Sequence, residues 1–483
     1  MKRALSLIVA IVMLCSSLVM APVTVAADDP VVTRFAVVSD VHTNPVSPAT
    51  TIDRLPKVFE TAYAYAESQG GKIDAFIFNG DSINGNETSK GYTNEDEMGI
   101  FLKGIKDNVK EGSKVLLAMA RTHDIYDGDG NIYYVQESEL NALIAEHLGT
   151  DGSIIPTADW GYAPHLTMVG GVPVITLTND IGNGNAVNTE DDGNAGNDDN
   201  ADNSYHDSEA WLDTQLAALT AENPERAIFV VFHYPEVGKL GWTQRWGQNS
   251  LRDTLNKYPQ VIAVNAHVHW DPRMTDSITQ DRFTEVYDGA VRNASGWAAE
   301  SAMPSYSVIE VTESGAVTIR YIDPETGDFL QEANGSGETL TYSIPKAWDR
   351  STYLYTDEQK FAVDEAAFAA DASIKLQNGT LTFDRAESEH PVLRYNVAVH
   401  DGKVTKTYTV SGDYLGETLP ATFSTKLALK TGIDYTITVT AVDGLFRESA
   451  NALVLTGNIN DPEKVLSGTA TAVAEKTYGG NGT

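Results

Sequence analysis

Aspartate and histidine residues follow five apolar, β-prone segments of the chain. They are Asp40 and His42 after 35–39, Asp81 after 75–78, His123 and Asp124 after 115–118, His233 after 228–232, and His267 and His269 after 261–264. Taken singly, each has an ordinary explanation as a loop start, a helix cap or a buried histidine. Five strands that each end in such residues are different, because α/β sheets place their sites at the carboxyl ends of strands. Eight such groups at one edge would repel one another or stay unsatisfied without a cation, so the pattern indicates a metal site, and oxygen and imidazole ligands suit Zn, Fe or Mn.

The elements that must position these residues alternate between short apolar runs and amphipathic segments from about residue 31 to 323. This alternation predicts an α/β domain with helices packed on a sheet. Further strands are expected at 172–177, 306–311 and 317–322, the last two joined by a turn at 313–315. Helices are expected at 54–68, 97–110, 137–148, 207–219 and 249–257.

The order Asp-x-His, Gly-Asp, His-Asp, His and His-x-His resembles the calcineurin-like metallophosphoesterase family over about residues 31–323. The resemblance implies a four-layer α/β/β/α sandwich and two divalent or trivalent metal ions. It assigns Asp40, His42 and His269 to one ion, His233 and His267 to the second, and Asp81 to a bridge between them. It further implies attack on phosphorus by a metal-bridged hydroxide, while His123, held by Asp124, protonates the leaving group or stabilises charge on the phosphoryl oxygens.

The sequence departs from the family pattern just before His123. Thr122 stands where the family normally has the Asn that completes the second metal site, and a Thr hydroxyl is a weaker neutral ligand. We therefore expect the second ion to bind loosely, or a water molecule to take that place. Arg121 is either a surface residue on a turn or a phosphate clamp, because a guanidinium group suits phosphate oxygens.

The first 27 residues are typical of an export signal, with Lys2 and Arg3 before an apolar run and small residues before a cleavage site near Ala27. A membrane anchor is the alternative, which the short, interrupted run disfavours. The only cysteine, Cys15, lies in this segment, so a mature chain would have no disulfide. The predicted location is extracellular or in the cell envelope.

The chain contains 67 acidic and 34 basic residues, for a formal net charge of -33. A field of this sign disfavours binding to nucleic acid and to anionic membranes. No segment beyond the export signal is apolar enough to span a bilayer, so no span is expected in the mature chain. The expected partner is a small or polymeric phosphate ester.

The predicted domains are a phosphoesterase domain at 31–345 and a smaller β domain at 366–457. The first contains an acidic Asn/Asp/Gly-rich loop at 179–203, for which a calcium site or lid is a weaker alternative because the EF-hand spacing is absent. The second consists of short alternating strands, which predicts an all-β sandwich. It resembles a fibronectin type III domain through 381–383, Tyr395 and 431–443, with Phe383 where that family usually carries Trp. The tail at 458–483 is typical of a linker.

These observations predict a secreted, dinuclear-metal phosphoesterase for phosphomonoesters or phosphodiesters. The alternative is a catalytically weakened, metal-binding adhesion or recognition module, for which Thr122 is the best support. A nucleotidase with a base-binding carboxyl-terminal domain is disfavoured, because that part of the chain is small and resembles a β-sandwich.

Overall fold

The computed structural model describes residues 29–85, 90–120, 123–124, 135–180, 204–241, 243, 247–292, 303–333, 336–412, 419–460 and 464–472. The predicted export signal with Cys15, the residues Arg121 and Thr122, and the acidic loop from 181 to 203 lie outside the described residues. The expectations that concern them stay predictions.

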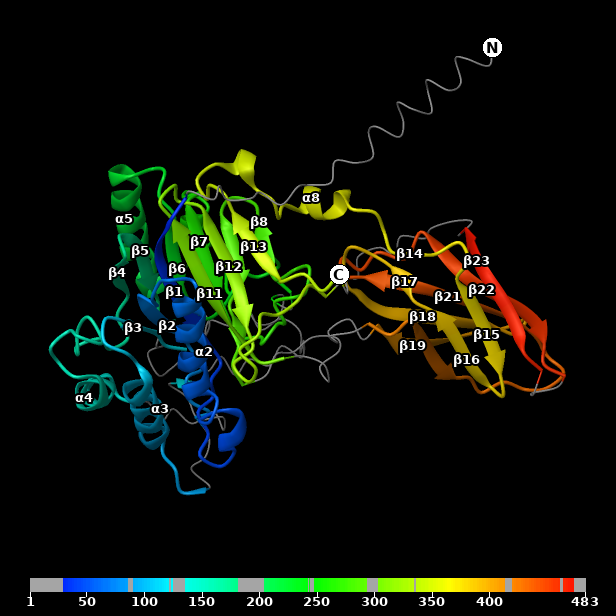
Figure 1. Ribbon diagram of the computed structural model, residues 1–483, viewed down its shortest axis with the longest axis horizontal. Helices are drawn as coiled ribbons and strands as arrows, with labels where there is room; N and C mark the ends of the chain where they lie inside the picture. The colour runs from blue at the N-terminus through cyan, green and yellow to red at the C-terminus, as the bar shows by residue number, and fades with distance from the viewer. Residues whose placement is uncertain are drawn as a thin grey trace, which may run out of the picture.

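Two mixed sheets form the amino-terminal domain (Figure 1). The first has the order β13-β12-β11-β1-β2-β3, with β10 on β11, and the second has the order β4-β5-β6-β7-β9-β8. The strands of the first sheet are β1 Val31–Val38, β2 Ala75–Asn79, β3 Lys114–Ala118, β10 Gly289–Ala290, β11 Ser305–Thr312, β12 Val317–Ile322 and β13 Thr341–Ile344. Those of the second are β4 His165–Val169, β5 Val172–Thr176, β6 Ile228–Val231, β7 Val261–Asn265, β8 Ile278–Gln280 and β9 Thr284–Tyr287.

The strands that precede the predicted site residues run parallel to their neighbours. In the first sheet β1, β2 and β3 are parallel, and in the second β5, β6, β7 and β9 are parallel. Their carboxyl ends therefore lie at a common edge of each sheet. The remaining strands pair antiparallel, including the expected β11–β12 hairpin.

Helices cover the outer faces of the two sheets, and a shared apolar core fills the space between them. Phe59 of α2 packs on Phe76 of β2, with ring centroids 4.3 Å apart, and Phe35 of β1 meets Phe229 of β6 across the sheets at 4.9 Å. Alternate residues of β6 face opposite sides: Phe229 belongs to the core between the sheets, and its neighbour Val230 to the core under α5. This gives the α/β/β/α order.

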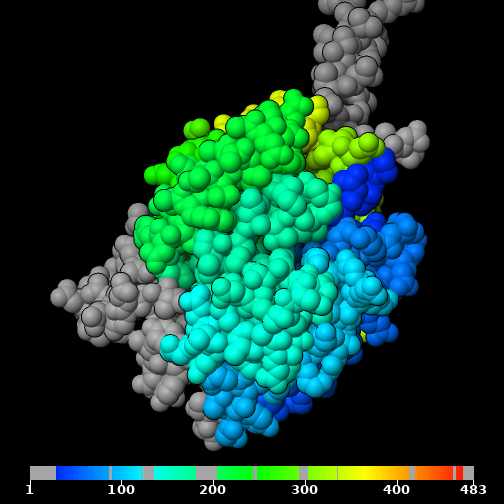
Figure 2. Space-filling view, turned by 90° about the vertical axis from the view of Figure 1, so that its left-hand side faces the viewer, coloured from blue at the N-terminus to red at the C-terminus, as the bar shows by residue number. Residues whose placement is uncertain are grey.

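The helices of the domain are η1 Pro48–Thr50, α2 Leu55–Ser68, α3 Asn94–Asn108, α4 Glu137–Leu148, α5 His206–Glu222 and α7 Arg252–Leu255, followed by η6 Arg350–Thr352 and α8 Asp357–Ala362. The cyan part of the surface, which includes α4, lies between the green part that includes α5 and the blue part that includes α3 (Figure 2). Among the described residues, no helix is both long and apolar enough to cross a membrane.

Several helix boundaries differ from expectation, and α5 for example continues to Glu222, three residues past its expected end. Helix α3 begins three residues earlier than predicted, because the Thr93 side chain and Asp96 form a capping box at its start. The segment expected to be helical at 249–257 forms only the short α7. After Leu255 the chain forms turns with i→i+3 hydrogen bonds, from Lys257 N–H to the Thr254 carbonyl and from Tyr258 N–H to the Leu255 carbonyl, so the helical i→i+4 pattern does not continue.

The carboxyl-terminal domain is an all-β structure around a core of its own. Its main sheet has the order β19-β18-β21-β22-β23-β15-β16-β20, and β14 pairs with β17. The strands are β14 Ala367–Phe368, β15 Ser373–Gln377, β16 Thr380–Asp384, β17 Ala386–Glu387, β18 Val392–His400, β19 Thr405–Ser411, β20 Thr422–Lys426, β21 Asp434–Asp443, β22 Asn451–Asn458 and β23 Leu466–Ala472. Alternate residues of β18, among them Tyr395 and Val397, face this core, as the period-2 pattern predicted.

Strand β23 corrects the expectation of a linker from residue 458 onward. Leu466–Ala472 pairs with both β15 and β22, so it joins the two halves of the sheet. This strand was not expected because its residues are mostly small and polar, and because one of its two partners, β15, lies far earlier in the chain.

The two domains contact each other directly. Leu393 of β18 belongs to a small buried cluster with Trp270 and Met274, which follow the His267-Val268-His269 segment in the chain. The Arg447 guanidinium donates to the Val363 carbonyl oxygen at 2.8 Å. The carboxyl-terminal domain therefore supports the segment that leaves the predicted site.

Candidate metal centre and active site

Six of the predicted ligands converge at the edge where the parallel strands end. They form two overlapping groups, one of Asp40, His42, Asp81 and His269 and the other of Asp81, His233 and His267. Within each group the possible ligand atoms all lie within 4.8 Å of one another. Asp81 belongs to both groups, so its carboxylate lies between them.

Nitrogen and oxygen atoms of the two groups face one another at short range. Nε2 of His42 lies 3.0 Å from Nε2 of His269 and 3.6 Å from Oδ2 of Asp81. The same Asp81 oxygen is 3.3 Å from Nε2 of His233, and Oδ1 of Asp40 is 3.1 Å from Nε2 of His269. Four of these five side chains are almost fully buried, and His269 is partly buried. Buried nitrogen and oxygen atoms that face one another at about these distances are the arrangement of ligand atoms around a cation.

Burial and charge act in opposite directions on these groups. Burial lowers the pKa of His42 and of His267 to about 3. Burial acts on His233 in the same direction, but the carboxylates of Asp81 and Asp40 outweigh it and raise its pKa to about 10. Burial would raise the pKa of Asp81, yet His233 and its neighbours hold it well below the usual range. Without a metal ion, the protonated His233 offsets only one of the two buried carboxylate charges, so the cluster requires further positive charge.

The donor atoms fit a metal centre. Nδ1–H of His233 donates to the Asn79 carbonyl oxygen at 2.7 Å, so Nε2 faces Asp81 and would offer its lone pair to a metal ion that replaces the Nε2 proton. Metal-ligating histidines commonly donate their other ring N–H to a carbonyl in this way. Among the described residues, Oδ1 of Asp81 and Nε2 of His233 are buried without a hydrogen-bond partner. The two clusters are compatible with a binuclear site, and their oxygen and imidazole donors suit Zn, Fe or Mn.

Five of the six candidate ligands have an unusual backbone conformation. Asp40, His42, Asp81, His267 and His269 have φ angles between 48° and 78°. Residues with a side chain rarely adopt positive φ, and the exceptions cluster at functional sites. Elsewhere in the described residues, only Asn378 and Phe446 share this feature among non-glycine residues. Backbone strain is therefore concentrated where the ligands are presented.

Gly80 allows the two sheets to approach each other at the site. Its φ is 76°, and an added Cβ would lie 2.6 Å from Nδ1 of His233 and 2.7 Å from Cβ of Ala120. No larger residue fits there without displacing the His233 ring. The Gly80 carbonyl oxygen also accepts the Asp40 N–H at 3.1 Å, so this residue ties the β1 and β2 loops together.

Asp288 is a positioning residue that the sequence analysis missed. It is fully buried after β9, and its two carboxylate oxygens accept hydrogen bonds from the Ser39 hydroxyl at 2.8 Å and the Asn79 amide at 2.9 Å. Burial raises the pKa of Asp288 well above its usual range. Ser39 precedes Asp40, and Asn79 holds His233, so Asp288 links the supports of two ligands. Asp288 would have been identified as a residue at the carboxyl end of a parallel strand if 284–287 had been recognised as a strand parallel to β7.

His123 lies beside the metal cluster without belonging to it. Its Nε2 is 4.0 Å from Oδ2 of Asp81, and its Nδ1 lies 2.8 Å from the Asn84 carbonyl oxygen, to which Nδ1–H donates. The side chain is 29% exposed, so a solvent-borne molecule can reach it. This is a suitable position for a group that exchanges protons with a ligand at the cluster.

Asp124 does not hold His123 as expected. Its carboxylate accepts backbone N–H groups of Ser82 at 2.7 Å, Ile83 at 3.2 Å and Ala120 at 2.8 Å. Burial, reinforced by the charge of Asp81, raises the pKa of Asp124 to about 7. Asp124 therefore braces the loops after β2 and β3, while the Asn84 carbonyl orients His123. Arg121 and Thr122, which precede this pair, lie outside the described residues.

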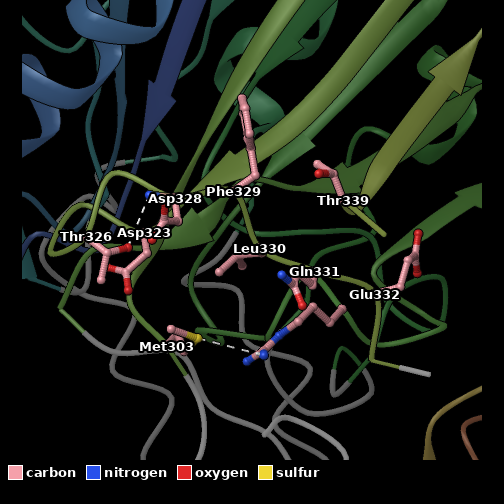
Figure 3. Close-up of a pocket in the computed structure, with 10 residues that line it drawn as sticks. Met303, Asp323, Thr326, Asp328, Phe329, Leu330, Gln331, Glu332 and Thr339 are labelled. Carbon is pink, nitrogen blue, oxygen red and sulfur yellow. Dashed lines mark hydrogen bonds between the residues drawn. The ribbon is translucent and has the colours of Figure 1, made fainter. Parts of the chain in front are cut away.

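A separate cavity of about 440 Å³ is lined by Arg273, Met303 and residues between Asp323 and Thr339 (Figure 3). None of the six candidate ligands lines it, and its wall includes the carboxylates of Asp323, Asp328 and Glu332. Burial raises the pKa of Glu332 to about 7, and the Arg273 guanidinium on the same wall is paired with Asp271 at 2.7 Å. Such a lining is unfavourable for a phosphate group, because the carboxylates repel it.

The family model for calcineurin-like phosphoesterases matches residues 33–271, the stretch that contains all six candidate ligands. Residues 33–271 are a calcineurin-like phosphoesterase domain. The observed mixed α/β fold and the paired His/Asp clusters agree with this assignment.

The solved structures similar to the chain include the following two. Purple acid phosphatase PPD1 from yellow lupin (Lupinus luteus) seeds has 11% identity and a TM-score of 0.37, and the match covers 68% of this chain and 55% of that one. The NAD nucleotidase of Haemophilus influenzae has 8% identity and a TM-score of 0.31, with 91% of this chain and 89% of that one covered. The chain thus spans about half the length of the lupin phosphatase. No curated protein matches the sequence.

Proposed function

We propose that the chain is a secreted, metal-dependent phosphoesterase that hydrolyses phosphate monoesters or diesters. The observation that carries the proposal is the convergence of Asp40, His42, Asp81, His233, His267 and His269 within a domain of the calcineurin-like phosphoesterase family. Export is supported by the amino-terminal signal pattern.

The ligand groups define where metal ions would bind. Asp40, His42 and His269 would hold one ion, His233 and His267 the other, and Asp81 both. When bound, the ions would supply an activated water and would offset charge on the phosphate oxygens. The buried carboxylates and the backbone around Gly80 keep these side chains in place before any substrate arrives, so little reorganisation is needed.

His123 is the proposed proton donor to the leaving group. The Asn84 carbonyl oxygen fixes Nδ1–H, so Nε2 is the atom that takes up and releases a proton on the side facing Asp81. Its partial exposure gives room for an alkoxide leaving group. Asp124 contributes by fixing the Ala120 end of the loop that carries His123.

The carboxyl-terminal domain is proposed to be fibronectin type III-like and to act as a spacer or binding module. Support comes from two runs of neighbouring strands, β15-β16-β20 and β19-β18-β21-β22, which β23 joins. Phe383 packs in the core against Tyr395, with ring centroids 5.1 Å apart. If Thr122 weakens the second ion enough to abolish catalysis, the whole chain is instead a metal-dependent recognition module.

Replacement of His123 tests the enzyme proposal. Metal-loaded wild type should hydrolyse p-nitrophenyl phosphate or bis(p-nitrophenyl) phosphate, and His123→Ala should lower kcat by about 10² to 10⁴-fold, the usual contribution of a general acid. Metal content should not change, because His123 is outside the ligand clusters.

His206→Ala is the matched control, since His206 is an exposed histidine at the start of α5. It should keep full activity. An inactive wild type that holds two ions would favour the recognition module, and an unaltered kcat in His123→Ala would remove the proposed acid.

A further inference from the structure

Arg292 lies next to the metal cluster by virtue of the backbone around it. It follows β10, and its N–H donates to the carbonyl oxygen of Asp40 at 2.9 Å. The preceding residue, Val291, donates to the carbonyl oxygen of Ser39 at 3.1 Å. Arg292 is therefore paired with the segment that presents the first metal ligand.

The guanidinium group of Arg292 is turned toward the proposed acid. Its Nη1 donates to Oδ1 of Asn84 at 3.1 Å, and the carbonyl oxygen of the same Asn84 accepts from Nδ1 of His123. Nε2 of His123 in turn is 4.0 Å from Oδ2 of Asp81. One residue, Asn84, thus separates the guanidinium from His123.

The charge of Arg292 is not compensated by a carboxylate within the described part of the chain. Seven other arginines there form ion pairs with Asp or Glu, namely Arg34, Arg54, Arg226, Arg252, Arg273, Arg320 and Arg447. The partner of Arg292 is the neutral amide oxygen of Asn84, and most of its five N–H donors stay available. The chain has about twice as many acidic as basic residues, so an arginine without a carboxylate partner is uncommon in it. Next to the candidate metal ligands, this guanidinium is in a position to bind an anion.

The backbone that carries Arg292 is held in place. The Arg54 guanidinium donates to the carbonyl oxygens of both Val291, at 2.9 Å, and Arg292. Arg54 itself is paired with Glu325 at 2.7 Å. A positioned guanidinium loses less conformational entropy on binding than a mobile one, which favours recognition of a fixed group.

We propose that Arg292, oriented by Asn84, binds a terminal phosphate oxygen of the substrate and directs the site toward phosphomonoesters. This inference rests on the proposed function and specifies its substrate class. A guanidinium fork matches the geometry of phosphate oxygens. A monoester phosphate carries about 1.5 to 2 negative charges and three terminal oxygens, whereas a diester has one charge and two terminal oxygens, so an added fixed cation favours the monoester.

The test compares Arg292→Gln with wild type on p-nitrophenyl phosphate and on bis(p-nitrophenyl) phosphate. Gln can keep the hydrogen bond to Asn84 but has no charge. We expect KM for the monoester to rise about tenfold or more, since a charge-assisted hydrogen bond is lost, while kcat/KM for the diester changes less than about threefold. Arg292→Lys, which keeps the charge without the fork, should recover part of the monoester preference.

A second readout does not depend on turnover. Calorimetric titration of the metal-loaded protein with inorganic phosphate should show binding that weakens about tenfold or more in Arg292→Gln and less in Arg292→Lys. Arg226→Gln is the matched control, because Arg226 is paired with Glu222 at the end of α5 and should leave both measurements unchanged. Equal metal content and melting temperature in each variant would show that the fold and the clusters are intact.

An Arg292→Gln protein with its metals in place and with wild-type phosphate affinity and ester preference would overturn the assignment of Arg292. The same holds if the diester suffers as much as the monoester. If wild type hydrolyses neither ester, the proposed function fails, and phosphate affinity alone then decides whether Arg292 binds phosphate.

Discussion

The role of each buried acidic residue in this protein depends on which N–H and O–H groups donate hydrogen bonds to its carboxylate oxygens. Asp124 sits next to His123 in the sequence, which predicted that the carboxylate orients the imidazole. In the structure both oxygens of Asp124 are occupied by backbone N–H groups, and the histidine is held by the carbonyl of Asn84. The side chains of adjacent residues after a strand point in different directions. The position of Asp124 next to His123 in the sequence therefore did not mean that the two side chains are in contact.

Glu285 is a second buried acid whose state depends on its surroundings. It lies on β9, and one of its oxygens accepts the Glu236 N–H at 2.7 Å. Burial, reinforced by the charge of Glu236, raises the pKa of Glu285 to about 8, while Lys239 and Arg252 act weakly in the opposite direction. Because this carboxyl binds its proton more tightly in the folded state, its contribution to stability is full below about pH 4.5 and is lost as pH rises through about 8.

Replacement of Glu285 by Gln should therefore change the pH dependence of unfolding. We predict that Glu285→Gln gains stability relative to wild type between pH 5 and 9, by on the order of 2 kcal/mol at the upper end, since Gln mimics the neutral carboxyl. Urea unfolding at several pH values, with the same metal concentration throughout, measures the difference. Glu225→Gln, at an exposed turn, should give a constant offset. A constant offset for Glu285→Gln as well would show that this carboxyl does not titrate in that range.

At the scale of elements, the parallel strands and their carboxyl ends account for most of the site. Strands β1, β2, β3, β6 and β7 lie close to where apolar runs predicted them, and their ends bring together the six candidate ligands. Strand β9 was missed because Thr284 and Glu285 are polar, so its four residues do not form an apolar run, and Asp288 was missed with it. The bonds of Asn84 to His123 and Arg292 join distant loops, which no local pattern indicates.

The carboxyl-terminal sheet offers a test of an element that sequence analysis assigned to a linker. In β23, a Cβ on Gly468 would lie 1.9 Å from the backbone oxygen of Val454 in β22. A Cβ on Gly457 would meet only the side chain of Leu466, with the nearest atom, a methyl carbon, at 3.1 Å. Backbone cannot yield as a flexible side chain can, so the two glycines should differ in their tolerance.

We predict that Gly468→Ala destabilises the carboxyl-terminal domain by about 2–4 kcal/mol, whereas Gly457→Ala costs less than about 1 kcal/mol. Differential scanning calorimetry, which can resolve the transitions of two domains, is the appropriate measurement. Phosphatase activity at 25 °C should be similar in both variants. Equal, small effects would mean that β23 does not pack on β22 as described.

At the scale of the whole molecule, a strongly acidic chain is organised around a site that requires positive charge. The formal charge of -33 and the buried pair Asp40 and Asp81 both oppose the approach of a phosphate ester. Bound metal ions and the guanidinium of Arg292, which has no carboxylate partner among the described residues, would make the local charge at the site positive. Metal should therefore stabilise the fold as well as permit catalysis, because it neutralises carboxylates that folding brings together.

Metal stoichiometry tests the central claim most directly. Elemental analysis after loading with Zn, Fe or Mn and equilibrium dialysis should give two ions per chain for wild type and for His206→Ala. His267→Ala should retain one, and Asp81→Asn should weaken both, because Asp81 belongs to both ligand groups. A wild-type protein that takes up no metal, or an Asp81→Asn protein that keeps two ions as firmly as wild type, would contradict the account.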